Sequence, residues 1–403
     1  MKIIDGGVCA PLGFKANGIH CGIRKNKDKR DLALIYSEKL ANTAAVYTLN
    51  LVKGAPLEVS KEHLKNGLAQ AIICNSGNAN TCNANGIDIA NKMCKYTADA
   101  LGINAEDVVV ASTGVIGQEL NPEPIKQGMS SLVEGLGNNS DYAAQAIMTT
   151  DTKKKELAIE FTIDGKSCRI GAIAKGSGMI HPNMATMLVF ITTDVAISSE
   201  MLNIALQNDI QSTFNLLSID GDTSTNDFVC LMANCMAENK PIIKDDADFA
   251  LFMKALNTVT MELCKEIAAD GEGATKRLEC YVEGAKTLKD AKTAAKSVIC
   301  SSLFKAAMFG ADANWGRVLC AIGYSGADVD VNKIDVSFKS DAGCIAVCKN
   351  GGRIYFSEEE AKKILLEKEI EILVNLNEGN FEAKAWGCDL SYDYVKINGD
   401  YRS

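Results

Sequence analysis

The chain has 403 residues, of which 47% are hydrophobic and 23% charged, and its formal net charge is −9 at pH 7. This composition is typical of a globular protein, and the length allows two or three domains. An acidic chain without a basic stripe is poorly suited to bind nucleic acid or an anionic membrane, so we expect neither as a partner.

The N-terminus, the apolar runs and the cysteines predict a cytoplasmic protein. The first residues, MKIIDGGVCAPLGF, lack the apolar core of a signal peptide, and the longest apolar stretch, around Met187 to Ile191, is too short to cross a bilayer. The 15 cysteines form no C-x-x-C pair, which argues against a disulfide scaffold or a zinc ribbon. We expect most of them to be core residues, and with only three histidines we expect no metal site.

The alternation of apolar and amphipathic segments predicts an α/β or α+β fold. In chain order we expect a strand over 68–77, a helix over 86–102, a strand over 107–114, a hairpin over 156–178 that turns at Asp164-Gly165, and helices over 201–217 and 246–271. Strands and helices alternate again after Lys276, and Ser357 with its acidic neighbours predicts a helix start. The composition marks no domain boundary.

Short polar runs rich in Gly, Asn, Thr, Ser and Asp follow the ends of the apolar segments. Each run alone is typical of a loop, but together they indicate one site built on loops at strand ends. The runs are NSGNAN (75–80), ASTG (111–114), TTDT (149–152), KGSGMIHPNMAT (175–186), DGDTSTND (220–227), DGEGATK (270–276), GADANWGR (310–317) and NGDYRS (398–403).

Two common kinds of site do not fit these runs. The glycine-rich segments lack the spacing of a Walker A loop or of a dinucleotide fingerprint, and the chain has no G-x-S-x-G elbow. His181 precedes a proline in a predicted turn, so a histidine base is not favoured. The remaining option is a nucleophile that needs no histidine.

Thr186 is the candidate for that nucleophile. The hydroxyl of an N-terminal threonine attacks while its own α-amine, with a pKa of about 7.7–8.0, accepts the proton. Thr186 would become N-terminal if its hydroxyl attacked the Ala185 carbonyl and water opened the resulting ester. The plainer interpretation is that Thr186, a β-branched residue, enters a strand, and on these residues alone that interpretation stays ahead.

The segment KGSGMIHPNMATML resembles the self-cleavage segment of the ornithine acetyltransferases, the ArgJ family of glutamate N-acetyltransferases. Further segments resemble those of the family in the same order, from about residue 7 to the end of the chain. They are GVCAPLGFKANGI, NSGNAN, ASTGVIG, IMTTDT, DGDTSTND, DGEGATK, ADANWGR and AWGCDLSYDYVKINGDYRS. This ordered set favours cleavage between Ala185 and Thr186 over the strand interpretation.

The resemblance implies a two-part α/β fold, shared with self-cleaving aminopeptidases of the DmpA type, with the active site at the junction of the two cleaved chains. These would be an α chain of residues 1–185 and a β chain of residues 186–403, assembled as α2β2. The implied reaction of arginine biosynthesis moves an acetyl group from N-acetyl-ornithine to glutamate through an acetyl-threonine. No metal or organic cofactor is implied, although some members accept acetyl-CoA as a co-substrate.

The resemblance also implies catalytic and binding roles for the matching residues. Thr186 would be the nucleophile of both cleavage and acetyl transfer, and it would also contact the substrate. Thr113 and Gly114 would form the oxyanion hole. Lys175 would bind a substrate carboxylate, for which a cation is suited, and Thr149 would bind another part of the substrate.

The remaining substrate-binding positions implied by the resemblance are Glu272, Asn398 and Ser403. Glu272 suits the side-chain ammonium of ornithine, and the alternative is a salt bridge to Lys276 four residues later. Ser403 stands where the family often has threonine, and it keeps a hydroxyl and a chain-terminal carboxylate. NSGNAN and GADANWGR receive no role beyond shaping the pocket, a subunit contact or a buried turn.

Three alternatives stay open at this point. A hydrolase using Thr186 would release acetate without glutamate. A variant of the transferase would also use acetyl-CoA, and no residue decides this. A non-catalytic small-molecule-binding protein would remain uncut, with an inert Thr186.

Overall fold

The computed structural model describes residues 1–181 and 187–400. They form two compact units. Unit 1 holds Met1–Gly176, 187–211 and Thr223–Leu263, and unit 2 holds 177–181, Ser212–Asp222 and 264–400. Each unit therefore contains residues from both sides of the predicted cleavage site, so the predicted α and β chains are not the compact units. Cleavage into 1–185 and 186–403 concerns the covalent chain and stays a prediction.

Unit 1 is built on a nine-stranded mixed sheet with the order β1-β6-β7-β8-β10-β3-β4-β5 and with β2 paired to β3. The β4–β5 and β8–β10 pairs are parallel and the other pairs antiparallel. The strands are β1 (Lys2–Ile4), β2 (Phe14–Ile19), β3 (Leu32–Tyr47), β4 (Leu68–Asn75), β5 (Val108–Ser112), β6 (Lys155–Ile163), β7 (Lys166–Lys175), β8 (Leu188–Thr193) and β10 (Phe228–Ala233).

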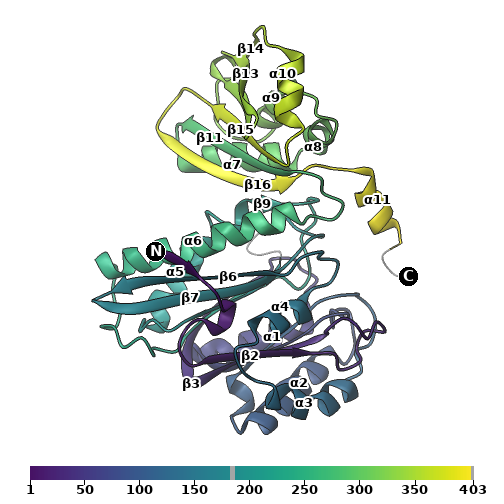
Figure 1. The fold of residues 1–403 in the computed structure, drawn as a ribbon, viewed down its shortest axis with the longest axis vertical. Coiled ribbons are helices and arrows are strands. Elements are labelled where there is room, and N and C mark those ends of the chain that lie inside the picture. The colour runs from purple at the N-terminus through teal and green to yellow at the C-terminus, as the bar shows by residue number, and fades with distance from the viewer. Residues whose placement is uncertain (182–186, 401–403) are drawn as a thin grey trace. The chain divides into compact units, whose positions relative to one another are not determined.

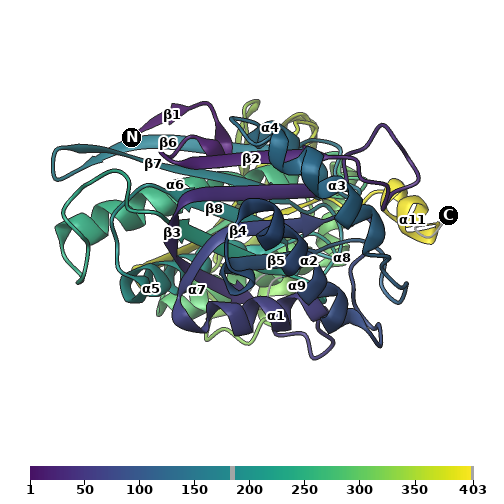
Figure 2. The same ribbon diagram turned by 90° about the horizontal axis from the view of Figure 1, so that it is seen from below.

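Helices cover this sheet on both sides. The views in Figures 1 and 2 place α2 and α3 on one side of β2 and β3, with α4 on the other. The helices of unit 1 are α1 (Ala55–His63), α2 (Gly86–Leu101), α3 (Glu123–Glu134), α4 (Ser140–Ile147) and α5 (Ser199–Ile210), with 3₁₀ turns at Gly7–Cys9, Leu64–Asn66 and Ala105–Asp107. Helix α6 (Ala247–Ala269) contains the boundary between the units.

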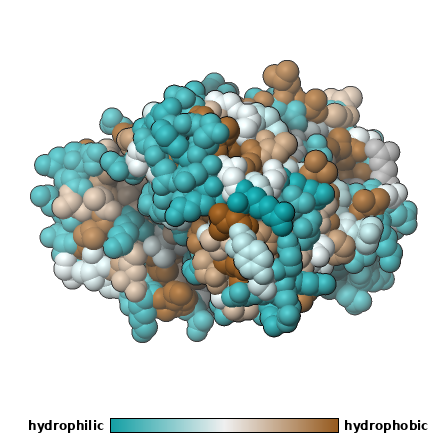
Figure 3. Space-filling view, turned by 90° about the horizontal axis from the view of Figure 1, so that it is seen from above, coloured by the Kyte–Doolittle hydropathy of each residue, from teal (hydrophilic) through white to brown (hydrophobic). Residues whose placement is uncertain are grey.

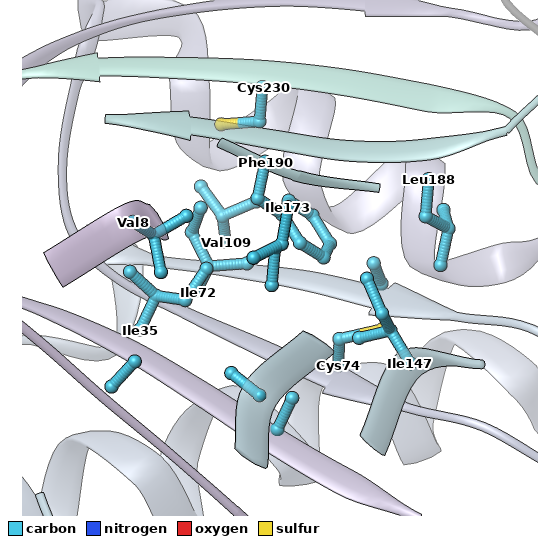
Figure 4. Close-up of a cluster of buried hydrophobic side chains, with 14 of the residues drawn as sticks. Val8, Ile35, Ile72, Cys74, Val109, Ile147, Ile173, Leu188, Phe190 and Cys230 are labelled. Atoms are coloured by element: carbon cyan, nitrogen blue, oxygen red, sulfur yellow. The ribbon is translucent and has the colours of Figure 1, made fainter. Parts of the chain in front are cut away.

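Two buried clusters follow from the alternation of side chains along the strands. On β4, Ile72 and Cys74 belong to the cluster that includes α4, whereas Ala71 and Ile73 belong to the cluster that includes α2 and α3. Figure 4 shows the first cluster, in which residues of β4, β5, α4, β7, β8 and β10 pack together. Burial of one Val, Leu, Ile or Phe side chain stabilises a fold by about 1.5–3 kcal/mol. Because each cluster buries many such side chains, the strand ends from which the polar loops start are firmly held.

Unit 2 is built on a seven-stranded sheet with the order β14-β13-β12-β15-β11-β16-β9. Helix α7 packs on β11 and β16, and α10 packs on β12 and β13. The strands are β9 (Leu217–Ser218), β11 (Arg277–Ala285), β12 (Asp335–Ser340), β13 (Gly343–Lys349), β14 (Gly352–Arg353), β15 (Glu369–Asn375) and β16 (Phe381–Cys388). The helices are α7 (Leu288–Cys300), α8 (Ser302–Phe309), α9 (Trp315–Gly323), α10 (Glu358–Leu365) and α11 (Tyr392–Gly399), with 3₁₀ turns at Phe214–Leu216 and Val331–Lys333.

Most predicted elements are confirmed, and so is the mixed α/β class. Asp164 and Gly165 take φ angles of 50° and 72°, as the predicted tight turn between β6 and β7 requires. Ser357 caps α10 by accepting a hydrogen bond from the Glu360 N–H. The helix predicted over 201–217 is too long, because α5 ends at Ile210. The apolar residues that follow are buried in a 3₁₀ turn and in β9, which periodicity alone does not separate from a helix.

Most of the cysteines lie in the core. No disulfide joins the 15 cysteines, all of which lie in the described residues, and eight of them are buried, which confirms that most of them are core residues. Among residues 1–181 and 187–400 no helix combines the length and the apolar character needed to cross a membrane. The face seen from above in Figure 3 is mainly hydrophilic, with hydrophobic areas between the polar ones.

Candidate functional site

The turn at Thr113 and Gly114 follows the end of β5. The Thr113 N–H donates to the Asn75 carbonyl over 3.0 Å, which ties the turn to the end of the parallel neighbour β4. Gly114 has a φ of +132°, and an ideal Cβ there would lie 2.3 Å from the Gly77 carbonyl carbon. Only glycine fits this close approach of two backbones.

Hydrogen bonds of buried asparagines hold this turn in place. Asn75 accepts a hydrogen bond from the Ser112 hydroxyl over 2.6 Å and donates to the Asn78 carbonyl over 2.9 Å. The Asn226 amide donates to the carbonyls of Ser112 (3.0 Å) and Ala79 (2.6 Å). The NSGNAN run, to which the sequence analysis gave no definite role, therefore fixes the end of β5 together with Asn226 of the DGDTSTND run.

Two donors of the turn have no internal acceptor. In the part of the chain that the structure describes, neither the Thr113 hydroxyl nor the Gly114 N–H donates a hydrogen bond. Thr113 is 9% exposed. Two preorganised and unsatisfied donors on one rigid turn suit an oxygen that gains negative charge, which is the predicted use of Thr113 and Gly114.

Asp151 brings Thr149 and the end of β7 together. Its Oδ2 accepts the Thr149 N–H over 2.9 Å, and its Oδ1 accepts the Gly176 N–H over 2.7 Å and forms an ion pair with Lys155 Nζ over 2.8 Å. Burial alone would raise the pKa of Asp151, but the Lys175 and Lys155 ammonium groups hold it well below its usual range. In the sequence, Asp151 stands out only as a member of the TTDT run.

The charges around Lys175 leave it available for an anion. Lys175 is 8% exposed, and within residues 1–181 and 187–400 its Nζ donates no hydrogen bond. Its ionised neighbour Asp151 is already paired with Lys155. Burial raises the pKa of its second acidic neighbour, Asp227, well above the usual range, and the Lys175 charge opposes that effect. Within the described residues the Lys175 side chain therefore has no hydrogen-bond acceptor, as suits a residue that is predicted to bind a carboxylate.

In unit 2 the structure brings Glu272 and Asn398 together. Glu272 is 8% exposed, and its Oε2 accepts a hydrogen bond from Asn398 Nδ2 over 2.7 Å. Its N–H donates to the Ser177 carbonyl over 2.7 Å, and an ideal Cβ on Gly178 would lie 2.2 Å from its Oε2. In the described ranges Oε1 accepts no hydrogen bond, so one oxygen of a buried carboxylate is open to a cationic group.

The alternative interpretation of Glu272 as a partner of Lys276 is wrong. The Lys276 ammonium donates to the carbonyls of Met308 and Phe309 instead. Burial lowers the pKa of Lys276, and the Asp389 charge opposes that effect. Glu272 therefore has no cationic partner among the residues that the structure describes.

Three predicted residues, Ala185, Thr186 and Ser403, lie outside the described residues. Strand β8 begins at Leu188, which pairs with Lys175 of β7. Leu188 belongs to the same buried cluster as Cys74, which precedes Asn75, and Ile147, which lies shortly before Thr149 (Figure 4). One apolar core thus anchors the strand and helix ends that carry the site residues of unit 1.

Among the described residues, unit 1 therefore carries two unsatisfied donors at 113–114 and a buried cation, and unit 2 carries a buried carboxylate. The ArgJ family model matches residues 15–403. Arginine biosynthesis bifunctional protein ArgJ of Caldanaerobacter subterraneus is 52% identical over 405 residues, covering all of both chains. The corresponding protein 1 of Clostridium acetobutylicum is 50% identical over 392 residues, which cover 97% of this chain and 96% of that one. The chain belongs to the ArgJ family, which confirms the predicted resemblance.

A solved structure agrees with this assignment. The crystal structure of arginine biosynthesis bifunctional protein ArgJ from Bacillus halodurans is 47% identical, with a TM-score of 0.50. The match covers 52% of this chain and 97% of that chain. The crystallised polypeptide is therefore about half as long as this one.

Proposed function

We propose that this chain is a glutamate N-acetyltransferase of arginine biosynthesis that transfers an acetyl group from N2-acetyl-L-ornithine to L-glutamate. The observation that carries the proposal is its similarity over the full length to relatives named for arginine biosynthesis. Those relatives are called bifunctional, which supports a second activity, the acetylation of glutamate by acetyl-CoA. The cytoplasm, where amino-acid biosynthesis takes place, is the proposed compartment.

The described residues provide groups of the right charge for such substrates. Thr113 and Gly114 would receive the acetyl oxygen as it becomes negative. Lys175, with Thr149 beside Asp151, would hold the α-carboxylate. Glu272 would bind the side-chain ammonium of ornithine, supported by Asn398. Ser403 is proposed as a further binding residue.

Thr186 is the proposed nucleophile, freed by cleavage of the Ala185–Thr186 bond. Its hydroxyl attacks the Ala185 carbonyl, the peptide nitrogen leaves as the Thr186 amine, and water then opens the ester to give the Ala185 carboxylate. The half-length chain in the crystal structure of the Bacillus halodurans relative supports cleavage near the middle. The pieces would stay together, because β7 pairs with β8 and β3 with β10 across the cut. We propose an α2β2 assembly.

Acetyl transfer follows a ping-pong course in this proposal. The Thr186 hydroxyl attacks the acetyl carbonyl while its α-amine takes the proton, and the adduct collapses as ornithine leaves with that proton. The glutamate amine then attacks the acetyl ester, and the Thr186 oxygen leaves with the proton restored. No step requires a metal or an organic cofactor. Water must be excluded from the ester, since otherwise the protein would act as the competing hydrolase.

Intact-protein mass spectrometry before and after brief incubation with N-acetyl-ornithine tests the proposal. We expect two fragments split at Ala185–Thr186, with one acetyl group on the fragment that begins at Thr186. The Thr186→Ala variant should stay uncut and lose the transferase activity by about 10⁶-fold, the loss seen when a nucleophile is removed. The control Thr162→Ala, on the exposed side of β6, should behave as the parent protein.

Two other outcomes would contradict the proposal. A single uncut mass that gains no acetyl group would favour a non-catalytic binding protein. Stoichiometric release of acetate in the absence of glutamate would favour a hydrolase. A direct assay with acetyl-CoA and glutamate decides whether the second activity exists.

A further inference from the structure

The segment 177–181, which lies shortly before the proposed cleavage site, is held by backbone hydrogen bonds within unit 2. The Ser177 carbonyl accepts from the Glu272 N–H over 2.7 Å, and the Ile180 carbonyl accepts from the Ile219 N–H over 2.7 Å. Ser177 and Ile180 are each 1% exposed. The chain before the cut is therefore not a free loop but is attached at both ends of this segment.

Asp220 holds the middle of the segment with both carboxylate oxygens. Its Oδ2 accepts the Met179 N–H over 2.6 Å, and its Oδ1 accepts the Ile180 N–H over 2.9 Å. Met179 has a φ of 55°, a left-handed conformation that a residue with a side chain rarely adopts. The paired bonds to one carboxylate stabilise a turn that the sequence alone disfavours.

Side chains add two further contacts to the segment. His181 Nδ1 lies 3.1 Å from the Ser218 hydroxyl and 3.5 Å from Cys300 Sγ. Gly178 packs directly on the Glu272 carboxylate, with no room for a Cβ. Glycine at position 178 therefore allows the segment to pass close to Glu272.

The support behind Asp220 is itself rigid. The Ile219 carbonyl accepts a hydrogen bond from the Lys305 ammonium, which is 3% exposed, and Ser218 belongs to β9, paired with β16. Burial raises the pKa of Tyr394 on α11, and the charge of the nearby Asp220 carboxylate adds to that effect. Asp220 therefore lies in a rigid part of unit 2, and its hydrogen bonds to Met179 and Ile180 fix the backbone conformation of the segment.

We propose that Asp220 is a positioning residue for self-cleavage, which fixes the backbone of residues 177–181, the described segment that leads to the proposed cleavage site. This inference rests on the proposed cleavage. Segment 177–181 belongs to the predicted fragment 1–185, whereas Asp220, Ser218 and Glu272 belong to 186–403. The same bonds therefore hold the end of the first fragment on the second after the cut. Asp220 takes no part in acetyl transfer itself.

The test measures the rate at which the two fragments appear after a pulse of cell-free translation of the full chain. In Asp220→Asn an amide NH₂ replaces one acceptor and faces a backbone N–H, so we expect cleavage to slow about 100-fold, the effect of misplacing reacting groups by roughly 1 Å. Molecules that have been cut should transfer acetyl groups with the parent kcat. The control Asp222→Asn removes the same charge from an exposed neighbour and should cleave at the parent rate.

The outcomes separate this inference from the proposed function. If the parent chain and Asp222→Asn are not cut, the proposed cleavage is wrong. If they are cut and Asp220→Asn is cut equally fast, the positioning role is overturned. A lower kcat per cut molecule would also overturn it, since Asp220 would then act in transfer. Should Asp220→Asn fail to fold, Asp220→Ala carries the test, because water can reach the half-buried site and replace the lost acceptors.

Discussion

The two units carry candidate groups of opposite charge and hold them in place by different contacts. In unit 1 the candidate groups are donors and a cation. Among the described residues they have no hydrogen-bond partner, because buried side chains such as Asn75 and Asp151 satisfy the groups around them. In unit 2 the candidate group is the Glu272 carboxylate, fixed by one side chain, Asn398, and by backbone contacts with 177–178. The difference teaches that a buried group can be held in two ways, by a network of buried side chains as in unit 1 or mainly by backbone contacts as in unit 2.

The largest effect should come from the donors of unit 1. Thr113→Val keeps the shape of the side chain and removes the hydroxyl, so we expect kcat per cut molecule to fall about 10²–10³-fold, equivalent to about 2.7–4 kcal/mol of transition-state stabilisation. Steady-state kinetics with N-acetyl-ornithine and glutamate measure this. Thr162→Val on β6 is the control. An unchanged kcat would remove Thr113 from the reaction.

The cation of unit 1 should matter for both substrates. Lys175→Met removes the charge but leaves the Asp151–Lys155 pair, so the fold should survive while kcat/KM falls about 100-fold for N-acetyl-ornithine and for glutamate. Lys166→Met at the exposed start of β7 is the matched control. If kcat/KM falls for only one of the two substrates, Lys175 does not bind the α-carboxylate, because both substrates have that group.

The carboxylate of unit 2 should matter for only one substrate. Glu272→Gln keeps an acceptor for Asn398 but loses the charge, so we expect the KM for N-acetyl-ornithine to rise about 20-fold. The KM for glutamate, which has no side-chain ammonium, should stay near the parent value. The exposed Glu359→Gln on α10 serves as control. Equal changes for both substrates would mean that Glu272 acts through the fold.

The smallest effect concerns a neutral group of unit 2. Burial, with the nearby Lys296 ammonium, lowers the pKa of His181 from 6.5 to about 4. Its contribution to the free energy of unfolding is therefore complete above pH 6.5 and is lost as the pH falls towards 4, because the unfolded chain then binds the proton more readily. The unfolding temperature of His181→Gln should fall less over this range than that of the parent or of His63→Gln. An identical fall in all three proteins would contradict the prediction.

The sequence by itself determined the family, the α/β class and most elements, because period-two and helical patterns, the Asp164-Gly165 turn and the Ser357 cap are local signals. Its resemblance to the family also predicts Thr113, Gly114, Lys175 and Glu272 as site residues. Their support was decided only in the tertiary structure: Asp151, Asp227 and Asp220 act on residues that are distant in the chain or on backbone groups. The hydrogen-bond partners of these carboxylates depend on how strands and loops pack, so no local sequence pattern identifies them. The end of α5 at Ile210 likewise depends on how the residues after it pack in the tertiary structure.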